Sequence, residues 1–264
     1  MRLLTALVVV LLVQAAPARA LEGLTPGEEA VVTEVVDGDT VILDRAVAGA
    51  TQVRLTGIQA PKLPLGRPGF KEWPLAREAK AELEALVLNK PVRLYFGGAR
   101  MDRHGRLLAH LEGPDGTWIQ GEMLGRGLAR VYTFPDNRKR AADMYGKEAR
   151  ARAARRGIWS HPFYAVRKAD PKALAGDIDT FQVVEGRLKD VAEVRGVVYL
   201  NFGANWRRDF TVRLDRKVAR LFRREGLGSE AFQGRVLRVR GWLKEWNGPM
   251  IEASHPEQIE VLEK

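Results

Sequence analysis

Short runs of apolar residues, many of them β-branched or aromatic, alternate with turn residues between positions 30 and 112. Runs of this kind bounded by Gly, Pro, Asn and Asp are typical of strands. Asp37-Gly38-Asp39, between two such runs, is a hairpin signal. We therefore predict strands at residues 31–36, 40–43, 52–58, 91–96 and 107–111.

Between and after these strands, other segments show the apolar spacing of helices. A Pro- and Gly-rich loop runs from Pro61 to Pro74, and from Leu75 to Leu88 the apolar residues fall on one side of a helix. Two more helical stretches are expected at 118–127 and 137–156, with Gly157 as a stop signal. Strands that close into a small barrel, followed by a helical tail, predict a mainly β fold with helices (α+β) ending near residue 160.

A similar pattern returns after a break. Residues 161–180 contain Pro, Gly and scattered charges, which indicates a linker. We expect five further strands at 181–188, 197–202, 209–214, 236–243 and 250–253, with a helix at 216–225 between the third and the fourth. This order is typical of an OB-fold barrel, whose sheet face binds oligonucleotides or oligosaccharides. The predicted domains are therefore residues 21–160 and 181–264.

The first twenty residues predict export. Arg2 precedes an apolar run from Leu3 to Val13, and Ala18-Arg19-Ala20 supplies a small-x-small cleavage site. This pattern is typical of a secretory signal peptide cut after Ala20, and the run is too short to span a hydrocarbon layer of about 30 Å. A buried first helix is the alternative. We expect a secreted or periplasmic protein with no transmembrane span in the mature chain.

The composition limits the kinds of catalytic and metal-binding site that the chain can form. The chain has no cysteine, which excludes disulfides, a thiol nucleophile and Cys-based metal sites. Four scattered histidines do not form a zinc motif. The formal net charge of +10 suits a nucleic acid (DNA or RNA) or another polyanion as partner, although solubility alone is an equally ordinary reason for it. Nothing in the sequence fixes the oligomeric state.

Several stretches of the first predicted domain together resemble the staphylococcal nuclease (thermonuclease) family. Their order and spacing match the family over about residues 30–160, and they are Val36–Val41, Val53–Pro61, Asp102–Arg106 and Gly127–Val131 with the closing Gly157–Trp159. The resemblance implies an OB-type barrel with helices and calcium-dependent hydrolysis of DNA and RNA. It also implies a site of three carboxylates and two arginines.

The chemistry of phosphodiester cleavage explains why such a site needs these residue types. Attack by water builds negative charge on the phosphoryl oxygens, and fixed arginines stabilise that charge through paired hydrogen bonds. Arg54 and Arg106 match the family's catalytic arginines. Calcium requires oxygen ligands, and Asp39 matches the family's first metal ligand, with Asp37 and Thr40 beside it. Surface arginines and a turn-forming Asp-Gly-Asp are the simpler alternatives.

The sequence departs from the family at the next positions. Gln59 stands where the family has its second metal-binding aspartate, and Lys62 stands where it has the glutamate that acts as general base. No Asp or Glu occurs from Arg45 through Lys71, so a shift of the alignment does not restore either carboxylate. A lysine, with an unperturbed pKa of about 10.4, does not readily accept a proton from water at neutral pH.

These replacements suggest a different use of the site. We expect the Lys62 ammonium to pair with Asp39 in the place of a cation and to join Arg54 and Arg106 in a metal-free phosphate pocket; a solvated loop lysine is the alternative. Gln59 still offers a neutral oxygen, so we expect calcium to bind here only weakly. Glu72 or Glu78 is the candidate for a substitute base.

Two further regions are candidates for nucleic-acid binding. The basic stretch that begins at Arg138, Lys139 and Arg140 could follow a phosphate backbone, or it could be a solvated face. In the second domain Trp206, Arg207 and Trp246 combine aromatic rings with a cation, as stacking of single-stranded bases requires.

Three functions remain open from the sequence. The first is an exported nuclease-family protein that binds nucleic acid or another polyanion, with phosphodiester cleavage doubtful. The second is an active thermonuclease-type endonuclease, a hydrolase, with an altered site. The third is an envelope scaffold that binds glycan or protein.

Overall fold

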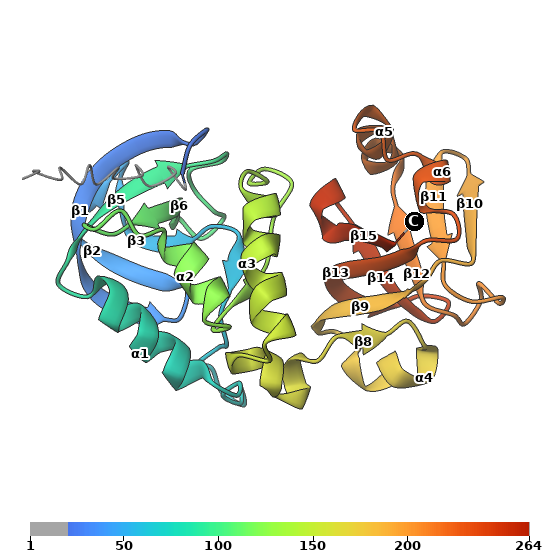
Figure 1. The fold of residues 1–264 in the computed structure, drawn as a ribbon, viewed down its shortest axis with the longest axis horizontal. Helices are drawn as coiled ribbons and strands as arrows, with labels where there is room; N and C mark the ends of the chain where they lie inside the picture. Colours follow the sequence, from blue (N-terminus) through green and yellow to red (C-terminus); the bar gives the residue numbers. More distant parts are fainter. Residues whose placement is uncertain (1–20, 264) are drawn as a thin grey trace, which may run out of the picture.

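The computed structural model describes residues 21–263, so the predicted signal peptide at residues 1–20 lies outside the described residues. Two units follow each other along the chain, the first in blue and green and the second in orange and red (Figure 1). Within the described range, no helix combines the length and the apolar character needed to cross a membrane.

The first unit is built on a closed five-stranded barrel. Its strands are β1 (Thr25–Asp37), β2 (Thr40–Val47), β3 (Ala50–Leu55), β5 (Pro91–Phe96) and β6 (Leu107–Glu112), in the order β1-β2-β3-β6-β5. The long β1 pairs with β5 through its first half and with β2 through its second, and β3 runs parallel to β6. The predicted α+β fold with an OB-type barrel is confirmed.

Three helices flank this barrel: α1 (Ala76–Val87), α2 (Ile119–Gly125) and α3 (Ala141–Ala153). Helix α1 buries Ala76, Ala79, Leu83 and Val87, the side that its spacing predicts. Helix α3 is shorter than the predicted stretch at both ends. Two short strands, β4 (Ile58–Gln59) and β7 (Arg130–Val131), pair with each other outside the barrel.

The connection between the units is folded rather than loose. It contains η1 (Gly157–Ser160), η2 (Pro162–Tyr164), β8 (Arg167–Lys168), α4 (Pro171–Leu174) and η3 (Ala175–Asp177). The Tyr164 hydroxyl donates to the Pro74 carbonyl at 2.7 Å, whereas Leu174 is buried in the core of the second unit. The predicted linker therefore belongs partly to each unit.

The second unit is an eight-stranded sheet with two helices. Its elements are β9 (Phe181–Arg187), β10 (Asp190–Val194), β11 (Val197–Asn201), β12 (Thr211–Leu214), α5 (Arg216–Arg224), α6 (Ser229–Phe232), β13 (Val236–Glu245), β14 (Pro249–Ala253), η4 (Pro256–Gln258) and β15 (Ile259–Glu263). The strand order is β10-β11-β12-β14-β13-β9-β8, and β15 pairs with β13.

This order repeats that of the first unit, with β9 and β10 in the place of the single long β1. The parallel pair β12 and β14 corresponds to the parallel pair β3 and β6. Because β9 and β10 are separate strands, the hydrogen-bonded path does not close, and the predicted second barrel is not confirmed.

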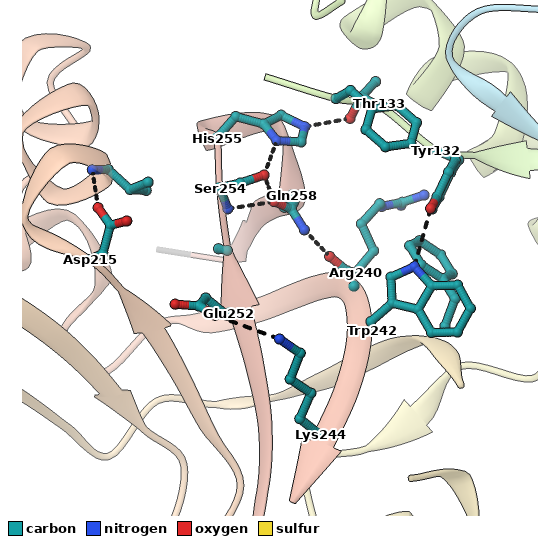
Figure 2. A pocket seen from close by; sticks show the side chains of 15 residues that line it. Tyr132, Thr133, Asp215, Arg240, Trp242, Lys244, Glu252, Ser254, His255 and Gln258 are labelled. Carbon is teal, nitrogen blue, oxygen red and sulfur yellow. Dashed lines mark hydrogen bonds and ion pairs between the residues drawn. The ribbon is translucent and has the colours of Figure 1, made fainter. Parts of the chain in front are cut away.

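Buried polar contacts fix the two units against each other. Arg240 of β13 is 1% exposed, and its Nη1 lies 3.0 Å from Glu148 Oε2 on α3, the helix that faces the second unit (Figure 1). Thr133 Oγ1 lies 2.8 Å from His255 Nε2 (Figure 2). The two units are therefore held together by more than the covalent connection.

Candidate functional site

A cavity of about 830 Å³ opens on the first unit and brings most of the predicted site residues together. It is lined by Asp37, Arg54, Gln59, Lys62 and Arg106. Strand β3 carries Arg54, strand β4 carries Gln59, and the segment before β6 carries Arg106. The side chain of Asp39 lies directly behind this wall and is fully buried.

Lys62 and Asp39 form the centre of the site. The Lys62 Nζ lies 2.7 Å from both carboxylate oxygens of Asp39 and 3.2 Å from Asp37 Oδ2. Asp39 also accepts a hydrogen bond from the Ala60 backbone N–H at 2.7 Å. The predicted pairing of Lys62 with Asp39 is therefore present, and the ammonium bridges two carboxylates.

The pKa values of the two aspartates are shifted in opposite directions. Burial alone would raise the pKa of Asp39, but Arg54, Lys62 and the hydrogen bonds it accepts hold that pKa well below the usual range. Burial and the nearby charge of Asp39 raise the pKa of Asp37, against the opposing effect of Lys62 and Arg54. Asp39 is thus the fixed anion of the site.

Arg54 is held by the backbone as well as by Asp39. Its Nη2 lies 3.2 Å from Asp39 Oδ2 and donates to the Ile58 carbonyl at 2.6 Å, and its Nη1 donates to the Leu55 carbonyl at 2.5 Å. These partners fix the guanidinium in one orientation. They also occupy donors that a phosphate would otherwise use.

Arg106 pairs with Asp102. Its Nε and Nη2 lie 2.8 Å and 2.6 Å from Asp102 Oδ2. Burial works against ionisation of Asp102, but hydrogen bonds from Arg106 and from the His104 backbone lower the pKa of that carboxyl. Arg106 is therefore positioned at the cavity as half of a charged pair.

Gln59 faces a buried arginine. Its Oε1 accepts hydrogen bonds from Arg130 Nε at 2.9 Å and from Arg130 Nη2 at 2.7 Å. Burial lowers the pKa of Arg130 to about 10, and the guanidinium lies 4.5 Å from the centre of the Phe181 ring. This partner was not predicted, because residues 59 and 130 are far apart in the sequence.

The residues present do not fit a calcium ion. A hard dication needs several free oxygen ligands. The Lys62 ammonium lies between the carboxylates of Asp37 and Asp39, and the Gln59 oxygen already accepts two hydrogen bonds from a cation. Among residues 21–263, no cluster of three or more His, Asp or Glu side chains is arranged to hold a metal.

The candidate substitute bases lie outside the cavity. Glu72 makes two hydrogen bonds of 3.0 Å to Arg77, and neither Glu72 nor Glu78 is part of the cavity wall. The hypothesis that one of them replaces the missing base gains no support from their positions.

Aromatic residues from both units complete the wall. Tyr132 and Phe134 follow β7, and Trp242 comes from β13 of the second unit. The Trp242 Nε1 donates to the Tyr132 hydroxyl at 3.1 Å (Figure 2). The same three residues also line a second cavity of about 370 Å³ between the units, whose side chains are drawn in Figure 2.

The predicted basic stretch is used largely for internal contacts. Arg138 lies 2.7 Å from both Glu257 and Glu225 of the second unit. Lys139 donates to the Gly23 carbonyl at 3.0 Å, and Arg140 pairs with Asp143 at 3.2 Å. Arg138 is therefore a contact between the units rather than a free phosphate ligand.

The predicted aromatic pair of the second unit is exposed. Trp206 is 52% exposed and Trp246 is 68% exposed, and Arg207 stacks on the Trp206 ring at 4.5 Å. Both tryptophans line a third cavity, separate from the one that contains Lys62. Whether these residues bind nucleic acid stays a prediction.

Sequence similarity to known proteins falls on the first unit. A family model described as "Staphylococcal nuclease homologue" matches residues 52–161. The thermonuclease of Staphylococcus hyicus is 29% identical over 136 residues, which are 49% of this chain and 75% of that protein. An uncharacterized endonuclease of Escherichia coli is 32% identical over 131 residues, which are 49% of this chain and 75% of that protein.

Proposed function

The chain belongs to the staphylococcal nuclease family, and from this premise we propose that it binds nucleic acid without calcium and with little or no phosphodiester cleavage. One observation carries the proposal: the Lys62 Nζ lies 2.7 Å from both oxygens of Asp39, so a fixed ammonium stands between the carboxylates of the site. The Lys62 ammonium neutralises the carboxylate charge of the site, so no metal ion is needed to do so.

The charge of the cavity favours a phosphate ligand. Five Lys or Arg side chains line it against three Asp side chains, and the whole chain is strongly basic. Phosphate contacts made by such cations supply most sequence-independent affinity for nucleic acid, and they weaken as salt rises. The ligand is therefore expected to be DNA or RNA recognised through its backbone.

The same residues explain why cleavage should be poor. A positioned general base contributes about 10²–10⁴-fold in rate, and the family's base position is Lys62 here. Asp37 lines the cavity but pairs with Lys62, and Asp102 pairs with Arg106. Each of these two carboxylates has a cationic partner to release before it accepts a proton from water.

The aromatic side chains of the cavity wall offer a surface on which a nucleobase can stack. Phe134 and Trp242 are 46% and 48% exposed at the edge of the cavity. An aromatic ring that stacks on a base contributes about 1–3 kcal/mol and tolerates any sequence. Single-stranded nucleic acid, whose bases are free to stack on protein, suits this wall best.

Export is part of the proposal and rests on residues 1–20, whose charged start and small-x-small end are typical of a signal peptide. N-terminal sequencing of the protein recovered from its native host tests it. A chain that begins at Leu21 is expected, and one that retains Met1 overturns export without affecting the binding proposal.

One titration tests binding and cleavage together. The purified protein is mixed with a labelled single-stranded oligonucleotide in calcium or in chelator, and binding and cleavage are followed in the same tube. We expect affinities within about twofold in the two buffers, a steep fall in affinity with salt, and no product.

The matched variant restores the family's acids. In Lys62→Glu with Gln59→Asp we expect calcium binding by calorimetry and an oligonucleotide affinity that depends on calcium. Calcium-dependent cleavage by the unaltered protein, abolished by Arg54→Ala, contradicts the proposal and establishes an active nuclease. Failure to bind the oligonucleotide at low salt also contradicts it and favours the glycan- or protein-binding scaffold.

A further inference from the structure

A groove of about 450 Å³ lies on the sheet of the second unit and shares no residue with the cavity that contains Lys62. Its floor comes from β10, β11, β12 and β14, and β10 and β11 lie at the end of the second unit farthest from the first (Figure 1). None of the contacts between the units described above involves this groove. It is therefore a separate surface whose ligand must be argued on its own.

Two exposed indoles border the groove. Trp206 lies in the loop between β11 and β12 and is 52% exposed, and Trp246 lies in the turn between β13 and β14 and is 68% exposed. Exposing two such rings at one site leaves apolar area in water, which a monomeric protein rarely does without a binding role.

The segments that carry these rings are well defined. The turn packs against the loop at Gly248, where an added Cβ would lie 2.4 Å from the Arg208 carbonyl oxygen. The Trp246 backbone N–H donates to the Gly248 carbonyl at 2.9 Å. In the loop, the Asp209 carboxylate accepts from the Asn205 backbone N–H at 2.6 Å. The two backbone segments that carry the rings are therefore fixed before any ligand binds.

Polar side chains form a row along the floor. The strand register pairs Asp190 with Asn201, Asn201 with Thr211, and Thr211 with Met250. Thr211 Oγ1 donates to Asn201 Oδ1 at 3.1 Å, and within residues 21–263 the Nδ2 of Asn201 has no hydrogen-bond acceptor. The floor thus offers an amide donor, a hydroxyl and a carboxylate next to one thioether.

The charge of the groove argues against a polyanion. Among the described residues, no Lys or Arg lines it, and Asp190 is its one charged side chain. Of the nearby cations, Arg207 stacks on Trp206 and Arg213 pairs with Glu252. Because backbone binding of nucleic acid requires cations that face the phosphates, a neutral ligand fits this surface better.

We propose that the groove binds a neutral oligosaccharide. A sugar ring has an apolar C–H face and a rim of hydroxyl groups, so its face stacks on Trp206 and Trp246 while its hydroxyls bond to Asp190, Asn201 and Thr211. A few fixed polar groups among apolar ones set orientation and specificity in such sites. The site is independent of the function proposed for the first unit.

Calorimetry with defined sugars tests the proposal. The full-length protein is titrated with cellohexaose, chitohexaose and maltohexaose, and with a single-stranded oligonucleotide for comparison. We expect at least one neutral sugar to bind with an affinity that changes less than twofold between low and high salt, since no ion pair forms. Trp206→Ala and Trp246→Ala should each lower that affinity at least tenfold, which corresponds to loss of a stacking contact worth about 1.4 kcal/mol.

Two controls keep the result specific. Trp246→Phe retains a ring and should recover part of the lost affinity, whereas Phe163→Leu removes an exposed ring outside the groove and should change nothing. The oligonucleotide titrated alongside the sugars reports on the nucleic-acid proposal, so failure of that proposal and failure of this one are distinguishable. Absence of binding to all three sugars overturns the proposal, as does salt-sensitive oligonucleotide binding that is lost in Trp246→Ala.

Discussion

At the scale of single residues, the site depends on a few buried charges. Asp39 is completely buried and is contacted by Lys62, Arg54 and the Ala60 N–H. A buried charge with such partners is stable only while all of them remain, because each loss leaves another charge desolvated and unpaired. Lys62, together with Arg54, supplies the counter-charge of Asp39.

Asp39→Asn should destabilise the protein by about 3 kcal/mol at neutral pH, since it leaves Lys62 and Arg54 without their common anion. The measurement is the unfolding free energy from urea titration. Asp37→Asn is the matched variant and should cost clearly less, because the fold already raises the pKa of Asp37 and so disfavours its charged form. Equal costs for the two substitutions would contradict this assignment of roles.

At the scale of elements, the local sequence pattern predicted the longer helices and strands and missed the short strands. Helix α1 and strands β5 and β6 lie where their spacing placed them. Strand β10 was missed because most of its residues are exposed and show no apolar alternation. The two-residue pair β4 and β7 was also missed, although it places Gln59 opposite Arg130. Such strands exist because of their partners rather than their own sequence.

Gly248→Ala tests how the turn after β13 is held. Gly248 has φ of +90° and its Cβ would meet the Arg208 carbonyl at 2.4 Å, so the turn must move away from the loop that carries Trp206. We expect a loss of about 2 kcal/mol or more in unfolding free energy. Gly226→Ala is the control, because Gly226 has φ of +74° with nothing within 4 Å of an added Cβ. It should cost about 1 kcal/mol from backbone strain alone.

At the scale of the whole molecule, buried charges and hydrogen bonds join the two units. The Arg240 guanidinium lies 3.0 Å from Glu148 and 2.6 Å from Glu260. Burial alone would lower the pKa of Arg240, but Glu148 and the other acidic neighbours hold it above its usual value. Because Trp242 lies two residues after Arg240 on β13, this packing also places an aromatic ring at the cavity of the first unit.

Arg240→Met should cost about 3–5 kcal/mol, because it leaves the fully buried Glu148 with one fewer cation. Urea unfolding measures the loss. Adding Glu148→Met should recover part of it, since the double variant no longer buries the Glu148 carboxylate without Arg240. Arg45→Met breaks an ion pair whose side chains are at least half exposed, and it should change stability by about 0.5 kcal/mol or less. A comparable cost for both arginines would contradict the interface role.

The contact between the units should also weaken in acid. Burial lowers the pKa of His255 to about 4, helped by Arg138 and opposed by Glu257 and Asp136. Because this pKa lies below the unfolded value of about 6.5, the stability gained from neutral His255 is complete above that pH and is lost as pH falls toward 4. The loss is up to about 3 kcal/mol.

Unfolding free energies measured between pH 7 and pH 4 test this. His255→Gln keeps a side chain that bonds to Thr133 and should show a smaller fall over this range than the unaltered protein. His161→Gln is the control, since the His161 ring contacts Tyr164 and the Phe163 backbone N–H rather than Thr133. An unchanged slope in His255→Gln would show that another group controls the acid response.

The sequence by itself determined the mainly β fold and the family of the first unit, and it predicts that two of the family's acids are replaced at positions 59 and 62. These depend on side-chain identity and on local spacing, which a chain carries before it folds. Only the tertiary structure decided that Gln59 bonds to Arg130, that Arg240 is buried and that Trp242 reaches the cavity of the first unit. Each of these is a contact between residues roughly 70 or more positions apart. Such contacts depend on how the packed elements meet, which no local pattern specifies.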